Sequence, residues 1–323
     1  HASFPIPGSP KKLNGPVLSI PVKTSPASPR LRRYIGLIHY PNLRSLSTPQ
    51  QLVFDDILAV LFCADIKFVM NCHIMTNNNA KIIIIPARLG ASRLPNKPLV
   101  DIAGKPMIQH VWERAMAADL APVYVATDDR SIADVIEQAG GKAILTRADH
   151  PSGSDRVFEA VEAIDPQQRF QHVLNLQGDL PEMPADIPHQ LAATLEHRDC
   201  ELATLVTPAS AEETAKPQIV KAVISWKANG FGDALYFSRA AVPTGTAEAY
   251  HHIGVYGWRR SALARFVSLP PSPLELAEKL EQLRALEAGM RIGVAKIAAA
   301  PGGVDTAEDL QAVRQRLAAV PEG

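Results

Sequence analysis

The sequence has little of what marks several large classes of protein. It holds only three cysteines in 323 residues, too few for a disulfide scaffold and typical of a protein from a reducing compartment. Its longest apolar run, residues 57–70, is interrupted by Asp65 and Lys67 and is shorter than the roughly 20 residues that a bilayer-spanning helix needs. We therefore expect a cytoplasmic protein with no membrane partner.

Neither sign of charge dominates, because 33 Lys and Arg balance 33 Asp and Glu. This balance argues against a constitutive binder of nucleic acid. The charge is uneven along the chain: residues 1–78 hold eight basic and three acidic residues, so they carry +5 and the remainder carries −5. Residues 1–50 also contain nine prolines, seven serines and no acidic residue. Such a segment buries too little apolar surface to offset its ordering entropy, so we predict a disordered extension over residues 1–80 and a catalytic domain over 81–323.

Two interpretations fit this extension. Its Ser- and Arg-rich, acid-poor composition is typical of an organelle transit peptide. Alternatively, it is an upstream segment read from a misassigned start, because Met75 and the polar residues after it would make an ordinary beginning before a first strand. We favour the second interpretation.

From residue 81 onward the pattern alternates between strands and helices. The run of four isoleucines at 82–85 is typical of a strand buried on both faces of a parallel sheet. Further strands are predicted at 123–126, 142–146 and 173–176, and helices at 107–118, 131–139 (capped by Ser131) and 154–164. This order predicts an α/β fold with a mainly parallel sheet, which binds its ligands at the carboxyl ends of the strands.

The second half of the chain favours antiparallel strands. Segments 219–224 and 233–237 flank Asn229-Gly230, a turn pair typical of hairpins. Two more strands are predicted at 252–258 and 291–297, and helices at 274–286 and 306–317. The last helix opens with Thr306 and Asp309, the pattern of a capping box.

Cationic residues follow the first strand. The loop 86–98 contains Arg88, Arg93, Lys97 and Gly90, and such a loop can neutralise a polyphosphate. It matches neither the P-loop nor the dinucleotide-binding glycine pattern. On composition alone a solvated basic loop fits equally well.

Two carboxylates follow later strands. Asp179 comes directly after the strand at 173–176, beside a glycine, and Asp305 precedes the capping box that leaves its side chain available for another task. A lone Asp at such a place is more often a turn residue. Two of them at separate strand ends, together with the basic loop, nevertheless make a Mg²⁺–nucleoside triphosphate site plausible.

A series of short motifs resembles one family. These motifs occupy residues 85–99, 104–107, 125–128, 146–150, 152–156, 177–179, 236–239, 252–257, 271–284 and 303–310. In this order, over about residues 81–317, they resemble the 3-deoxy-manno-octulosonate cytidylyltransferases, the CMP-Kdo synthetases of lipopolysaccharide biosynthesis. The combination is specific, although each motif alone is weak.

The resemblance implies a homodimeric nucleotidyltransferase that converts CTP and Kdo into CMP-Kdo and pyrophosphate with Mg²⁺. The implied fold is a three-layer, glycosyltransferase-A-like α/β fold with a mainly parallel sheet and a smaller antiparallel part for dimerisation and sugar binding. Such an enzyme has small-molecule substrates and no nucleic-acid partner.

The resemblance also assigns residues to the substrates and the metal. The CTP-binding set is Arg88, Ser92, Arg93, Lys97, Arg147, Ser154 and Gln177. The Mg²⁺ ligands are Asp179 and Asp305, which with Lys97 form the catalytic set. The sugar-acid set is Arg239, His252, Tyr256, Glu281 and Gln282. By composition alone, His252 would be a residue at the edge of the core and residues 281–282 part of a solvated helix face.

The chain departs from the family at two places. Leu180 stands where many members have Glu, and the connection 240–250 is shorter than in many members. Three alternatives remain. The enzyme could use another sugar acid, of the 8-amino-Kdo or sialic acid type. It could be a non-catalytic homologue, which the presence of both metal aspartates disfavours. A nicotinamide oxidoreductase is disfavoured because the glycine fingerprint is missing.

Overall fold

The computed structural model describes residues 80–90, 94–197, 199–227, 230–245 and 248–318. Apart from Ala80, the predicted disordered extension lies outside the described residues. So do two predicted nucleotide-binding residues, Ser92 and Arg93, and Asn229 of the predicted turn. In the part of the chain that is described, no helix is long and apolar enough to cross a membrane.

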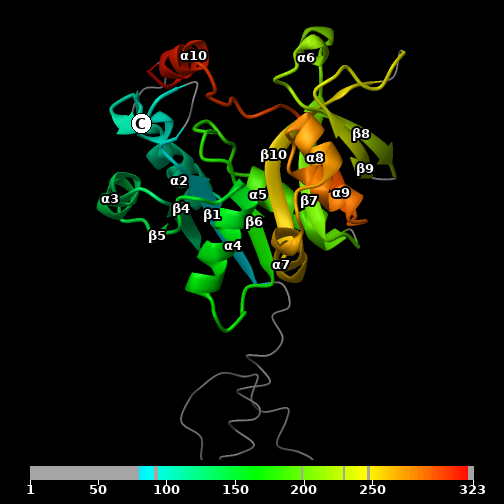
Figure 1. Ribbon diagram of the computed structural model, residues 1–323. Coiled ribbons are helices and arrows are strands. Elements are labelled where there is room, and N and C mark those ends of the chain that lie inside the picture. The colour runs from blue at the N-terminus through cyan, green and yellow to red at the C-terminus, as the bar shows by residue number, and fades with distance from the viewer. Residues whose placement is uncertain (1–79, 91–93, 198, 228–229, 246–247, 319–323) are drawn as a thin grey trace, which may run out of the picture. The chain divides into compact units, whose positions relative to one another are not determined.

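Within the described residues one large mixed sheet forms the centre of the fold (Figure 1), with the strand order β5–β4–β1–β6–β10–β7–β11–β9–β8. Its strands are β1 (Lys81–Ala87), β4 (Val123–Thr127), β5 (Ala143–Leu145), β6 (His172–Asn175), β7 (Leu202–Pro208), β8 (Lys221–Trp226), β9 (Phe231–Ser238), β10 (Tyr250–Arg259) and β11 (Ile292–Lys296). A separate hairpin joins β2 (Asp101–Ile102) to β3 (Lys105–Pro106).

The two halves of the sheet differ in strand direction. In the first half, β1 runs parallel to β4 and β6, and β4 runs parallel to β5, as the sequence predicts. In the second half, β10 lies antiparallel between β6 and β7, and β9 pairs antiparallel with both β8 and β11. Only β7 and β11 are parallel there, among the described strands. The prediction of a mainly parallel sheet therefore holds for the first half alone, because strands joined by short turns, such as β8 and β9, must run antiparallel.

Helices cover both faces of the sheet. On one face lie α2 (Met107–Ala117), α3 (Arg130–Gln138) and α5 (Ile187–His197), and on the other lie α4 (Gly153–Ile164), α7 (Arg260–Ser268) and α9 (Gln282–Glu287). Because side chains alternate along a strand, Ile83 and Ile85 of β1 pack under the first group while Ile82 and Ile84 pack under the second. The core is therefore divided between two interfaces, and the expected three layers are present.

Most of the predicted helices form, with two corrections. Asp129, not Ser131, caps α3: its carboxylate accepts a hydrogen bond from the backbone N–H of Ser131 at 2.8 Å. The single helix predicted over 274–286 is divided into α8 (Pro273–Glu278) and α9, because Lys279 has a left-handed backbone with φ 56°. The sequence patterns did not indicate α5, α6 (Ala211–Ala215), α7 or β7.

The C-terminal helix α10 (Ala307–Ala318) begins with the predicted capping box. The Thr306 hydroxyl accepts from the backbone N–H of Asp309 at 3.2 Å, and the Asp309 carboxylate accepts from that of Thr306 at 2.9 Å. Leu310 and Val313 of α10 pack in a small cluster with Ile102 of β2. This packing fixes the helix, and with it the position of the residue before the cap, Asp305.

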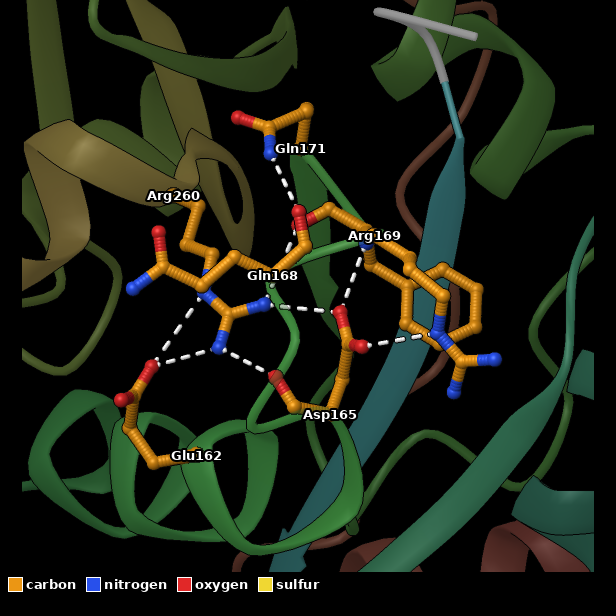
Figure 2. Close-up of polar contacts among 7 residues, drawn as sticks. Glu162, Asp165, Gln168, Arg169, Gln171 and Arg260 are labelled. Carbon is orange, nitrogen blue, oxygen red and sulfur yellow. Dashed lines mark hydrogen bonds and ion pairs between the residues drawn. The ribbon is translucent and has the colours of Figure 1, made fainter. Parts of the chain in front are cut away.

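A buried ion-pair cluster joins α4 to α7 (Figure 2). Arg260, the first residue of α7, is 4% exposed and donates to Glu162 at 2.6 Å and to the fully buried Asp165 carboxylate at 2.8 Å. Burial raises the pKa of Asp165, but donors from Phe170, Arg169 and Arg260 outweigh it and lower the pKa below its ordinary value. The cluster thus anchors the segment that leads into β6.

Candidate active site

A pocket of about 330 Å³ opens at the carboxyl ends of β1 and β6. Its polar lining includes Arg88, Lys97, Ser152, Arg156, Gln177 and Asp179. They come from segments that follow different strands and, in the case of Arg156, from the first turn of α4, so the fold brings these polar groups together at one edge of the sheet.

Gly178 allows the two strand ends to approach each other. A Cβ atom at this position would lie 2.9 Å from the carbonyl oxygen of Pro86, a contact that real Cβ atoms do not make. Only glycine therefore fits between Gln177 and Asp179, which turn toward the pocket from the end of β6.

The three predicted catalytic residues meet at one point. The Lys97 ammonium donates to Asp179 Oδ2 at 2.7 Å and to Asp305 Oδ1 at 2.9 Å. Lys97 opens the short 3-10 helix η2 (Lys97–Leu99), and its side chain is only 13% exposed. Burial lowers the pKa of Lys97, but the two carboxylates overcome this effect and raise the pKa above its ordinary value. Two carboxylates far apart in the sequence thus share one positive charge.

Three of the seven predicted nucleotide-binding residues, Arg88, Lys97 and Gln177, line this pocket. Arg88 lies exposed at its edge, and the Gln177 side-chain amide donates to the carbonyl oxygen of Gly254 in β10 at 2.6 Å. Ser154 is fully buried in the first turn of α4. Arg147 is exposed, and its guanidinium lies 3.3 Å from Glu159. Ser92 and Arg93 fall outside the described residues.

Sequence reasoning gave no role to three polar residues near the pocket, although His150 and Arg156 end two of the family motifs and Glu159 lies in a predicted helix. The Glu159 carboxylate accepts from the Arg147 backbone N–H at 3.1 Å and lies 2.5 Å from the ring nitrogen of buried His150. Arg156 is 3% exposed and donates to the Thr146 hydroxyl at 2.5 Å. The signal available in the sequence was the helical spacing of positions 156 and 159, which puts both on one side of α4 beside residues 146–150.

Three of the predicted sugar-acid residues come together on β10 and α9. The Tyr256 hydroxyl donates to the Gln282 side-chain oxygen at 3.1 Å, and the rings of Tyr256 and His252 lie 5.7 Å apart. His252 is 6% exposed and makes a 2.9 Å hydrogen bond with the Thr204 hydroxyl. Burial lowers the pKa of His252 to about 3, so the ring is neutral at physiological pH.

The other two sugar-acid residues are Arg239, which directly follows β9, and Glu281, which directly precedes α9. Burial raises the pKa of Glu281, and the neighbouring Ser152 and Ser154 only partly offset that rise. The Arg239 guanidinium donates to the backbone carbonyl of Glu278 at 2.8 Å, and the Arg239 backbone N–H donates to the Glu278 carboxylate at 2.9 Å. Arg239 is thus fixed by the end of α8, whereas Glu281 faces the N-terminal turn of α4.

Leu180, the departure from the family motif, is 8% exposed and packs in the core beneath the pocket. An apolar residue there fits its surroundings, and the side chain offers no ligand to the site.

Comparison with known proteins gives one consistent result. A family model described as cytidylyltransferase matches residues 82–292. A 3-deoxy-manno-octulosonate cytidylyltransferase of Rhodopseudomonas palustris (strain BisB18) is 53% identical over 238 residues, covering 73% of this chain and 97% of the relative. The enzyme of the same name from Nitrobacter hamburgensis is 52% identical over 241 residues, covering 74% of this chain and 93% of the relative.

Solved structures agree with these relatives. A CMP:2-keto-3-deoxy-manno-octonic acid synthetase, solved in complex with CTP, is 43% identical with a TM-score of 0.68, covering 74% of this chain and 98% of that one. A cytidylyltransferase from Leptospira borgpetersenii shares 15% identity with a TM-score of 0.50, covering 74% of this chain and 87% of that one, and shows the fold alone.

Proposed function

Because the chain belongs to the 3-deoxy-manno-octulosonate cytidylyltransferase family, we propose that it joins CTP to Kdo and releases pyrophosphate. The product, CMP-Kdo, is the activated sugar acid for lipopolysaccharide biosynthesis. The observation that carries the proposal is that Lys97 and Asp179 line the polar pocket and that the Lys97 ammonium joins Asp179 to Asp305. Another sugar acid, of the 8-amino-Kdo or sialic acid type, is not favoured, because relatives that share about half of their residues with this chain are named for Kdo.

The two carboxylates fit a Mg²⁺ ion. Asp179 and Asp305 converge on one positive charge, the Lys97 ammonium, so the same oxygens can approach one metal ion. Mg²⁺ in nucleotide sites is commonly held by one or two carboxylates plus phosphate oxygens and water. When bound, Mg²⁺ would neutralise phosphate charge and polarise the α-phosphate.

The basic residues of the pocket would bind the triphosphate. Lys97 and Arg88 lie where they can pair with phosphate oxygens, and we extend this role to Arg93 on the same loop. In the reaction, a hydroxyl oxygen of the sugar acid forms a bond to the α-phosphorus while the bond to the pyrophosphate group breaks. Fixed positive charge near the departing pyrophosphate stabilises the negative charge that it gains.

The nucleoside half of CTP is assigned to Arg147, Ser154 and Gln177. Glu159 holds Arg147 by its backbone N–H and its guanidinium, so the arginine is directed before CTP binds. Preorganisation of this kind lowers the entropy that binding must otherwise supply.

The sugar acid is assigned to Arg239, His252, Tyr256, Glu281 and Gln282. The Arg239 guanidinium suits the substrate carboxylate, and its hydrogen bond to the Glu278 backbone carbonyl limits its freedom. The neutral His252 ring and the Tyr256–Gln282 pair would contact hydroxyl groups without adding charge.

A homodimer in the cytoplasm completes the proposal. Leu235 on β9 and Leu276 on α8 are 59% and 64% exposed, and a second copy that covers them would bury this apolar surface. Sedimentation equilibrium of the wild type and of Leu235→Glu tests the dimer. A monomeric wild type would contradict it.

The activity itself is tested by pyrophosphate release from the full chain with CTP, Kdo and Mg²⁺. We expect turnover with this set, much less with UTP or ATP, and less with sialic acid or 8-amino-Kdo. Asp179→Asn is the matched inactive control. No pyrophosphate above that control would refute the function, and faster turnover with another sugar acid would refute the choice of Kdo.

A further inference from the structure

Asn175, the last residue of β6, has a fully buried side chain without a hydrogen-bond partner. It is 0% exposed, and neither its oxygen nor its nitrogen is paired with any of the described residues. Because both atoms are unpaired, turning the amide over changes nothing. Buried amides are nearly always hydrogen-bonded, so a buried amide without a hydrogen-bond partner needs a functional explanation.

The position of Asn175 in the sheet places it beside the sugar-acid residues. Asn175 and Tyr256 are directly opposite each other in the antiparallel pairing of β6 and β10, so their side chains project from the same face. Tyr256 in turn donates to Gln282, whose side-chain nitrogen is also buried and unpaired among the described residues. Tyr256 is therefore next to one amide with both polar atoms unpaired, Asn175, and one amide with an unpaired nitrogen, Gln282.

Asn175 also adjoins the nucleotide pocket along the chain. Gln177 follows it by two residues and Asp179 by four, and both line the pocket. The Gln177 amide reaches across to Gly254, two residues before Tyr256 on β10. Asn175 thus stands between the pocket assigned to the triphosphate and the residues assigned to the sugar acid, where the two substrates must meet.

We propose that Asn175 binds the sugar acid and, with Gln282, recognises its hydroxyl groups by hydrogen bonding. This inference rests on the proposed function. An amide offers a donor and an acceptor and carries no charge, so it matches a hydroxyl, which both donates and accepts, better than a carboxylate. A site built to pair with substrate hydroxyls rejects analogues that lack them, because its own buried groups are then left unpaired.

The test is Asn175→Leu in the full chain, a change that keeps four side-chain heavy atoms in the same branched order and removes both polar atoms. We expect KM for Kdo to rise at least 10-fold and KM for CTP to change less than 2-fold. The melting temperature should stay the same or rise, since an apolar group replaces an unpaired polar one. The control is Thr194→Val on α5, which removes a fully buried hydroxyl that is paired with the Gln190 carbonyl at 2.7 Å. It should leave both KM values unchanged.

A second measurement separates binding from a structural effect. Kdo analogues that each lack one hydroxyl should be discriminated against by the wild type, and Asn175→Leu should lose most of the discrimination at one hydroxyl. An unchanged KM for Kdo, an equal rise in both KM values, or discrimination as strong as in the wild type would overturn the inference. If the Leu variant does not fold, Asn175→Ser is measured by the same criteria. Failure of the wild type to use Kdo and CTP would instead contradict the proposed function.

Discussion

Replacing Lys97 with Met should increase the affinity of the free protein for a divalent cation. The change removes the ammonium and keeps the apolar stem. The two carboxylate oxygens that it separates are at most about 5.6 Å apart, since they lie 2.7 and 2.9 Å from the same nitrogen. At this distance two negative charges repel each other by about 3 kcal/mol at an effective dielectric constant of about 20, and by less than about 1 kcal/mol in bulk water.

Solvent exposure sets where the site falls between these limits. The side chains of Asp179 and Asp305 are 34% and 54% exposed, so screening is substantial. We take about 1–2 kcal/mol for the repulsion between the two carboxylates. Its relief by a bound Mg²⁺ corresponds to about 5- to 30-fold tighter binding of Mg²⁺ in the absence of CTP. The same variant should use CTP poorly, because the triphosphate loses a cationic partner.

The assay is calorimetric titration of wild type and Lys97→Met with Mg²⁺, and with Mn²⁺ as a second probe, without nucleotide. Lys105→Met is the control, because Lys105 is 47% exposed and pairs with Glu113 at 3.0 Å. Its metal affinity should equal that of the wild type. Equal or weaker Mg²⁺ binding by Lys97→Met would refute the reasoning that the ammonium occupies the position of the cation.

Three further predictions concern the site and the fold. Asp179→Asn and Asp305→Asn should each lower kcat on the order of 100-fold. The double variant should lose little more than the worse single one, because the effects of residues that act as a unit are not additive. If the two losses of kcat multiply in the steady-state rate of the double variant, the carboxylates do not serve one ion. Because the pKa of His252 is about 3 in the fold and about 6.5 in the unfolded chain, its contribution to stability is present above pH 6.5 and is lost as the pH falls toward 3, at up to about 1.4 kcal/mol per pH unit. Urea midpoints of the wild type should therefore fall more steeply between pH 7 and 5 than those of His252→Asn, and parallel curves would show that the ring is not held neutral. Arg260→Met should lower the free energy of unfolding by about 3–5 kcal/mol, because it removes the buried guanidinium that pairs with the fully buried Asp165 carboxylate. The double change with Asp165→Leu should recover part of that loss in the same urea titration, and no recovery would mean that the cost lies in packing.

Local patterns determined several parts of this protein. Four consecutive isoleucines can be buried only where both faces of a strand are covered, and β1 is the strand on which both halves of the core pack. The capping box at Thr306 needs only residues within one helical turn, and it forms as predicted. The site rim could also be predicted, because every parallel strand presents its carboxyl end at the same edge of the sheet.

Other features depend on contacts between residues that are distant in the sequence. The antiparallel position of β10 between β6 and β7 is set by strand pairing, which no local pattern encodes. The helix predicted over 274–286 is divided into α8 and α9 at Lys279, whose left-handed backbone no local pattern of the sequence indicated.

The chemistry of the site shows the same division. The sequence placed Asp179 and Asp305 on one rim, but only the fold showed that one ammonium joins them, since hydrogen bonds demand atoms within about 3 Å and sequence patterns locate residues far less closely. Asn175 reads in the sequence as one more position of a buried strand. Only the folded structure shows that its amide is unpaired, because hydrogen bonding depends on the neighbouring groups in the fold and not on the residue alone.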